Sequence, residues 1–264
     1  MAMLKKIFEP IYDFFDQRFK FGNVISSGEI AIQVGIDMDS TTTSDLFHMA
    51  NIVGENGTVI GIEPSPINIE RVDKVKDKYQ AKIVLVQKAT YSEKGEMTMQ
   101  FGTKAQWNRL DNIPGERVDE KFKDERIPIE MDTIDNILTE LNIPLKEISH
   151  INLTNNGAEF ETLRGMKNLI QNAENLSIYA IAGRPGELGR VNGEADHTAI
   201  INLLKEMGLK VKFQRFSEKF WSGFVKSRLI LGILKGRWNF GQQTPGVVMA
   251  KKGNKSFSIF ESYN

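Results

Sequence analysis

Short apolar stretches alternate with amphipathic stretches along most of the chain. The apolar stretches are rich in Ile, Leu and Val and predict strands over 29–35, 58–63, 82–87, 127–130, 149–153 and 175–181. Apolar residues at helical spacing predict helices between them, over 42–53, 66–79, 132–141 and 158–171. A turn over 92–95 is predicted between two short strands, and the polar stretch 102–126 reads as a long loop or small insertion. Strands separated by helices indicate a parallel sheet covered by helices on both faces.

The pattern changes near the end of the chain. One more helix and two strands are predicted, over 197–207, 209–216 and 246–251. The segment 217–245 between the two strands interleaves aromatic and aliphatic side chains with basic ones, and it contains no acid between Lys219 and Arg237. Such a segment is drawn to anionic surfaces. It is a candidate lid or substrate-recognition element, homodimer contact or membrane-surface contact.

The first 28 residues form a separate unit of the pattern. Apolar residues recur at helical spacing over 4–19, with charged residues on the opposite side. We expect this amphipathic helix to pack on the domain or on a second subunit, with peripheral membrane contact as the alternative. The chain therefore divides into an N-terminal helix, 1–28, and a single domain, 29–264, that carries the insertion 217–245.

Composition narrows the class of protein. A chain of 264 residues with 41% hydrophobic content can bury the core of one large α/β domain. Lys and Arg together number 34, as do Asp and Glu, so net charge favours no nucleic-acid partner. There is no cysteine, and the three histidines are scattered, so no metal site is expected. No apolar run is long enough to span a membrane, and we expect a cytoplasmic protein.

Two predicted strand ends carry the first sign of a ligand. The strand 29–35 breaks at Gly35, and the strand 58–63 stops on Glu63, which Pro64 follows. In a doubly wound sheet the first turn lets the backbone approach a nucleoside, and an acid after the second strand accepts bonds from the ribose hydroxyls. Gly35, Glu63 and Pro64 are therefore candidate cofactor-binding residues.

Two segments together resemble the FkbM-type methyltransferases. The first runs from Gln33-Val-Gly-Ile-Asp37 to Gly57-Thr-Val-Ile-Gly-Ile-Glu63-Pro-Ser-Pro-Ile-Asn68. The second runs from Met131-Asp-Thr-Ile-Asp135 to Ile148-Ser-His-Ile-Asn-Leu-Thr-Asn-Asn-Gly157-Ala-Glu-Phe-Glu-Thr-Leu-Arg-Gly165. The resemblance covers residues 29 to 182.

This resemblance implies a class I, Rossmann-like methyltransferase fold. It is a three-layer α/β sandwich with a mostly parallel seven-stranded sheet in the order 3-2-1-4-5-7-6, whose last strand is antiparallel. The implied cofactor is S-adenosylmethionine, and the implied reaction is O-methylation of a hydroxyl on a small-molecule, glycan or lipid-linked acceptor.

The chain departs from the family pattern at several strand-end positions. Gln33 replaces the acid at the end of the first strand, and Asp39 replaces a glycine of the turn. The family's Lys-x-Asp-x-Glu of the fourth strand is Asn152-Leu-Thr154-Asn-Asn156. These departures motivate an alternative function, a methyltransferase-like binding protein without turnover.

The turn after the first strand holds three more candidates. Asp37 and Asp39 are positioned either to contact the amino group of the methyl donor or to cap the following helix, as Ser40 does. Gln87 and Lys88 close the third strand, where the adenine edge of the cofactor would lie in this fold, with part of the contact through backbone.

The fourth strand and its surroundings are the expected place for catalysis. Thr154 is a candidate cofactor contact and Asn156 a candidate catalytic residue, although their side chains can position a substrate and cannot act as a base. Glu159, at the start of the next helix, is the nearest carboxylate. His197 follows the loop after the fifth strand and is the best candidate base.

Two function classes thus compete with the O-methyltransferase. One is the inactive binding protein, and the other is a membrane-surface interaction protein built on the helix 4–19 and the insertion 217–245. A nicotinamide dehydrogenase also uses an acid after the second strand, but the segment from Met131 to Gly165 argues against it.

Overall fold

The computed structural model describes most of the chain. The described residues are 21–22, 24–37, 41–103, 108–111, 122–184, 186, 189–215 and 245–257. The predicted helix over 4–19, the turn residues Asp39 and Ser40, and residues 217–244 of the insertion lie outside them. Membrane or subunit contact through these segments stays a prediction.

A seven-stranded sheet forms the centre of the fold, in the order β3-β2-β1-β8-β9-β13-β12. The strands are β1 (Ile30–Val34), β2 (Thr58–Ile62), β3 (Lys82–Val86), β8 (Ile148–Leu153), β9 (Leu176–Ala182), β12 (Lys210–Arg215) and β13 (Gly246–Lys252). Within this sheet, β3, β2, β1, β8 and β9 are parallel to one another, whereas β13 is antiparallel to both of its neighbours. The predicted strand order and the antiparallel last strand are confirmed.

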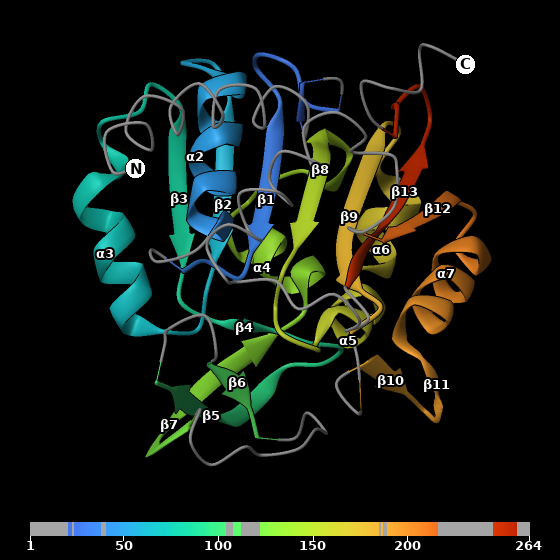
Figure 1. Ribbon diagram of the computed structural model, residues 1–264. Helices are drawn as coiled ribbons and strands as arrows, with labels where there is room; N and C mark the ends of the chain where they lie inside the picture. The colour runs from blue at the N-terminus through green and yellow to red at the C-terminus, as the bar shows by residue number, and fades with distance from the viewer. Residues whose placement is uncertain are drawn as a thin grey trace, which may run out of the picture.

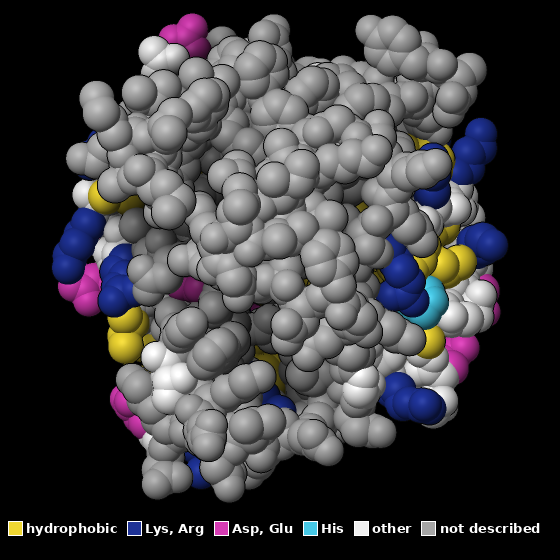
Figure 2. Space-filling view, in the orientation of Figure 1, with side chains coloured by type: hydrophobic (Ala, Val, Ile, Leu, Met, Phe, Trp, Pro, Cys, Tyr) yellow, Lys and Arg dark blue, Asp and Glu magenta, His cyan; other side chains and the backbone are white. Residues whose placement is uncertain are grey.

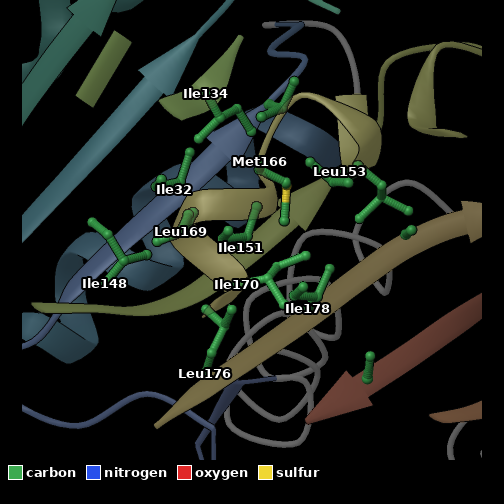
Figure 3. Packing of buried hydrophobic residues seen from close by; sticks show 14 of the residues in the cluster. Ile32, Ile134, Ile148, Ile151, Leu153, Met166, Leu169, Ile170, Leu176 and Ile178 are labelled. Atoms are coloured by element: carbon green, nitrogen blue, oxygen red, sulfur yellow. The ribbon is translucent and has the colours of Figure 1, made fainter. Parts of the chain in front are cut away.

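Helices cover both faces of this sheet (Figure 1). On one face, α2 (Thr41–Val53) and α3 (Pro66–Lys76) pack against Ala31 and Val59. The other face holds the larger core, with α4 (Ile134–Glu140), α5 (Glu159–Arg164), α6 (Lys167–Asn172) and α7 (Asp196–Glu206). Figure 3 shows this core, in which strand residues meet Met166, Leu169 and Ile170. Because side chains alternate along a strand, strands such as β1, β2 and β13 supply both cores.

The predicted helix over 158–171 is in fact two helices, α5 and α6. The break falls at Gly165, which caps α5. A Cβ atom at this position would collide with the backbone carbonyl oxygen of Tyr91. The close packing of two backbones therefore ends the helix where the sequence periodicity continues.

A second sheet was not predicted. It has the order β4-β7-β5-β6 and consists of β4 (Ala89–Thr90), β5 (Gly95–Gly102), β6 (Arg109–Leu110) and β7 (Phe122–Asp132). The predicted strand over 127–130 belongs to β7, so its placement in the main parallel sheet was wrong. The arrows of β3 and β8 point toward this small sheet in Figure 1. It therefore lies beyond the carboxyl ends of the parallel strands, together with a hairpin of β10 (Arg190–Val191) and β11 (Glu194–Ala195).

The described surface carries basic groups at two edges. Figure 2 shows Lys and Arg side chains over α3 and over α7 and β12. On α3, Lys74 pairs with Glu70 and Lys76 pairs with Asp73, so these lysines belong to a solvated helix face. In the part of the chain that the structure describes, no helix is both long and apolar enough to cross a membrane.

Candidate functional site

The carboxyl ends of β1 and β2 lie side by side because the two strands are parallel and in register, with Val34 opposite Ile62. Glu63 follows β2 directly, and its carboxylate reaches across to the turn after β1. The N–H of Ile36 donates to Glu63 Oε2 at 2.9 Å, and the N–H of Ser65 donates to Oε1 at 3.0 Å. The predicted pair of strand ends is thus one physical unit.

Glu63 is a buried carboxyl group, 6% exposed. Burial raises its pKa to about 7, against the lowering effect of the hydrogen bonds from Ile36, Ser65 and the Asn68 side chain. The carboxyl group of Asp37 lies near enough to raise the pKa further. A buried acid near its midpoint at neutral pH is typical of functional sites.

Gly35 has a structural requirement of its own. It adopts a positive φ of 77°, and a Cβ atom there would collide with the backbone carbonyl oxygen of Thr154. The Thr154 hydroxyl in turn donates to Val34 O at 2.8 Å. The glycine therefore permits β1 and β8 to end in contact, whether or not a ligand approaches the turn.

Of the other predicted cofactor residues, two lie around Glu63 and two lie in the turn after β3. Asp37 is buried beside Glu63, and half-buried Pro64 leads into the Ser65 cap of α3. Gln87 is exposed after β3. The Lys88 ammonium is already engaged, at 2.6 Å from Glu140 Oε2 and 3.2 Å from Asp132 Oδ2, so a contact from this turn is left to Gln87 or to backbone.

The side chains at two positions where the chain departs from the family pattern, Gln33 and Asn152, form a buried hydrogen-bond network. Asn152 Nδ2 donates to Gln33 Oε1 at 2.7 Å and to Asp45 Oδ2 at 3.2 Å. Gln33 Nε2 donates to Gly35 O at 2.9 Å. The two positions that hold an acid and a lysine in the family pattern are therefore direct partners, and two neutral amides keep their contact here.

The end of β8 offers no free base. Thr154 bonds the end of β1, and Asn156, with a φ of 54°, donates to the backbone oxygen of Asn108 at 2.9 Å. Asn155 Nδ2 donates to the hydroxyls of Thr90 and Thr162 at 3.1 and 2.7 Å. These bonds tie the strand end to the small sheet and to α5, which makes them part of the wall of the site.

Glu159 is held in an ion pair. Arg184 donates to its two carboxylate oxygens at 3.0 and 2.5 Å and to the backbone oxygen of Ile181 at 3.1 Å. Glu159 also accepts the N–H of Gly157 at 2.8 Å. Both side chains are largely buried, so the pair joins the turns after β8 and β9 and engages both carboxylate oxygens of Glu159.

His197 lies at the start of α7, on the same edge of the sheet. Its ring stacks on Phe213 at a centroid distance of 4.5 Å. Its Nδ1 is 3.6 Å from Asp196 Oδ1, and that carboxylate accepts the N–H of Gly183 at 2.7 Å. Among the predicted catalytic residues, His197 alone combines a titratable nitrogen with partial exposure, at 23% for the side chain.

Three residues that the sequence interpretation missed complete the site: Asp45, Asn68 and Arg184. Asp45 lies on the apolar face of a predicted helix, one residue before Leu46 and four before Met49, a position that signals a buried polar group. Asn68 follows Ser65 at capping distance. Arg184 lies in a loop, and nothing in its spacing points to Glu159. Among the described residues, no group of acids and histidines could hold a metal ion.

Comparison with known proteins adds a family assignment. A domain model described as the methyltransferase FkbM domain matches residues 30–211, which is more than half of the chain. No curated protein matches at a significant level.

Several solved structures have a related arrangement. A proposed rRNA methylase from Clostridium thermocellum is 13% identical, with a TM-score of 0.48 over 94% of this chain and 97% of the other. The plantazolicin methyltransferase BamL is 10% identical, with 0.45 over 92% and 85%. A methyltransferase from Aquifex aeolicus is 13% identical, with 0.41 over 89% and 90%. Because these scores are low, the assignment rests on the domain match and the strand order.

The raised pKa of Glu63 predicts a stability that depends on pH. The folded pKa of about 7 lies above the ordinary value of 4.5, so the folded state binds the proton more tightly. The free energy of unfolding should therefore fall as the pH rises from 4.5 to 7, by about 3 kcal/mol at most. Glu63→Gln removes this contribution. Urea unfolding of both proteins at several pH values measures it, and a difference between them that is constant with pH would contradict the assignment.

The amide network predicts a large cost for the loss of its central donor. Asn152→Leu leaves Gln33 Oε1 and Asp45 Oδ2 without this partner in a buried place and should lower the free energy of unfolding by about 2 to 4 kcal/mol. Asn172→Leu is the matched control, because that exposed amide donates to the backbone oxygen of Asn168. The control should change stability by less than about 0.5 kcal/mol. Equal effects in urea unfolding would rule out the network as a stabilising unit.

Proposed function

The chain belongs to the methyltransferase FkbM domain family, and we propose that it transfers a methyl group from S-adenosylmethionine to a hydroxyl oxygen of a small-molecule, glycan or lipid-linked acceptor. The observation that carries this proposal is Glu63, a buried carboxyl group at the end of β2 that faces the turn after β1. Burying such a group without a cation is costly. A diol that donates to it would offset the cost.

The residues at this edge fit the nucleoside of the cofactor. A carboxylate has about four lone-pair positions, and three donors among the described residues reach Glu63, namely the N–H groups of Ile36 and Ser65 and the Asn68 amide. Ser65 and Asn68 donate to Oε1, and Ile36 alone among these three donates to Oε2. Oε2 therefore retains an acceptor position. Asp37 lies beside it as a second acid, suited to the cationic amino group of the methyl donor.

When bound, S-adenosylmethionine supplies an electrophilic methyl group. The protein then has to align the acceptor oxygen with that methyl group, which is chiefly a matter of positioning. The wall of the site suits this task, because the bonds of Asn155 and Asn156 and the Glu159–Arg184 pair fix the turns after β8 and β9. His197 is the group that would accept the hydroxyl proton.

A second candidate function is a binding protein of the same fold without turnover. It is favoured by the neutral side chains of Asn152, Thr154 and Asn156 and by the ion pair that occupies Glu159. The amide network weakens this alternative, since the exchanged residues keep a buried contact with each other instead of opening the site.

Cofactor binding is the first test of the proposal. Isothermal calorimetry should detect S-adenosylmethionine and S-adenosylhomocysteine, and Glu63→Ala should weaken both by about tenfold or more, as expected for loss of a charged acceptor. Affinity should also increase with pH up to about 7, the pKa of Glu63, because the ionised carboxylate is the better acceptor. Glu70→Ala, at an exposed acid of α3, serves as the control. Absence of binding at millimolar ligand would overturn the proposed enzyme.

Methyl transfer is the second test. Radiolabelled S-adenosylmethionine with a panel of hydroxylated small molecules, glycans and lipid-linked sugars should give a product in which mass spectrometry places the methyl group on oxygen. His197→Gln should lower turnover by about 10²- to 10⁴-fold with unchanged affinity for S-adenosylhomocysteine. The control His48→Gln, at a half-buried histidine within α2, should have little effect. Cofactor binding without transfer to any acceptor would favour the binding protein. A normal rate in His197→Gln would remove its assignment as the base.

A further inference from the structure

Two carboxyl groups in this protein are built into the same local arrangement. Glu63 and Asp132 each follow or end a strand, and each is followed by a hydroxyl residue that caps the next helix, Ser65 for α3 and Thr133 for α4. In both cases an Asn three residues after the cap donates its backbone N–H to the capping hydroxyl. The same Asn turns its side-chain amide back to the acid.

The distances are similar in the two arrangements. Asn68 Nδ2 donates to Glu63 Oε1 at 3.3 Å, and Asn136 Nδ2 donates to Asp132 Oδ1 at 2.9 Å. The backbone N–H groups of these two asparagines donate to Ser65 Oγ at 3.4 Å and to Thr133 Oγ1 at 3.0 Å. The chain therefore contains an internal reference for what such an asparagine does in a purely structural setting.

The two carboxyl groups differ in their counter-charge. Asp132 is fully buried and has the Lys88 ammonium at 3.2 Å. Burial acts to raise its pKa, but the bonds from Asn136 and Thr133 and the lysine together lower it below its usual range. Among the residues that the structure describes, the donors around Glu63 are neutral, and the charged side chain that faces it, Asp37 from the turn after β1, is an acid. Asp132 is thus an anion with a counter-charge, whereas Glu63 has hydrogen bonds but no cation beside it among the described residues.

Asn68 itself is incompletely satisfied. It is 2% exposed, and its Oδ1 is buried without a hydrogen-bond donor in the described part of the chain. Exchanging the amide oxygen and nitrogen would point the oxygen at an acceptor, Glu63 Oε1, so the orientation is fixed. A buried acceptor with no partner destabilises the folded state, and in a native protein it calls for an explanation. Asn136 has no such unsatisfied atom among the described residues.

We propose that Asn68 is a positioning residue for the nucleoside, which holds the Glu63 carboxylate in place through its amide nitrogen and offers its buried amide oxygen to a ribose hydroxyl. This inference rests on the proposed function. It assigns the ribose diol two adjacent acceptors, Glu63 and Asn68 Oδ1, and it accounts for both the missing counter-charge and the missing donor. The proposal adds a specificity for ribose over a deoxygenated sugar, because a missing hydroxyl would leave one of these acceptors unpaired.

The test is calorimetric titration of the full chain with S-adenosylhomocysteine from about pH 6 to 8.5, for the unmodified protein, Asn68→Leu and Asn68→Asp. Asn68→Leu loses the donor to Glu63, so the pH at which affinity reaches half of its plateau should move upward, with about tenfold weaker binding near pH 6.5. Near pH 8.5 the carboxylate is ionised in both proteins, and a remaining loss of about fivefold would report the amide oxygen.

Asn136→Leu is the matched control. It should lower stability in urea unfolding by an amount similar to that of Asn68→Leu, while the affinity for S-adenosylhomocysteine and its pH profile stay unchanged. Asn68→Asp keeps the shape and an acceptor oxygen but loses the donor, so it should shift the profile at least as far. It also serves if Asn68→Leu does not fold.

Each outcome decides a separate point. If the unmodified protein binds S-adenosylhomocysteine and the Asn68 variants bind it with the same pH dependence, the positioning role is overturned and the proposed function stays intact. A shifted profile with full affinity near pH 8.5 overturns the contact of the amide oxygen. An unmodified protein that does not bind S-adenosylhomocysteine overturns the proposed function and this inference together.

Discussion

One hydrogen bond organises the candidate site, the bond from the N–H of Ile36 to Glu63 Oε2 at 2.9 Å. It joins the turn after β1 to the residue after β2 and fixes a carboxyl group at the edge of the sheet where parallel strands end. Without this bond the burial of Glu63 would be an uncompensated cost. The bond is possible because Gly35 allows the chain to turn beside Thr154, so the ends of β1, β2 and β8 form one mechanical unit.

The positions at which the chain departs from its family form a second unit. Gln33, Asn152 and Asp45 are buried together between β1, β8 and α2. Where one member of a buried pair changes, the other is left with an unpaired group. Here both members are neutral and hydrogen-bonded, which is the outcome expected of a matched exchange. Loss of charge at these positions is therefore weaker support for loss of activity than the sequence suggests.

Periodicity predicted the main sheet well, because its strands are buried on both faces and read as apolar runs. The small sheet escaped because β7 carries Arg126, Pro128 and Glu130 exposed on one face, a pattern that resembles a loop. Strand ends located Glu63 and Gly35, since spacing along the chain encodes them. Partnerships such as Glu159 with Arg184, 25 residues apart, depend on how loops meet, and one sequence does not contain that information.

The contact between Gly35 and the backbone of Thr154 also bears on how this chain would change over generations if it no longer bound a ligand. A side chain at Gly35 would separate two strands, so the glycine would persist in an inactive descendant for reasons of folding alone. Glu63 has weaker protection, because a glutamine there would keep an acceptor for one of the N–H groups of Ile36 and Ser65 and would remove the burial of a charge. Retention of the acid at position 63 would therefore distinguish a homologue that still binds the ligand from one that has lost this function, whereas retention of the glycine at position 35 would not.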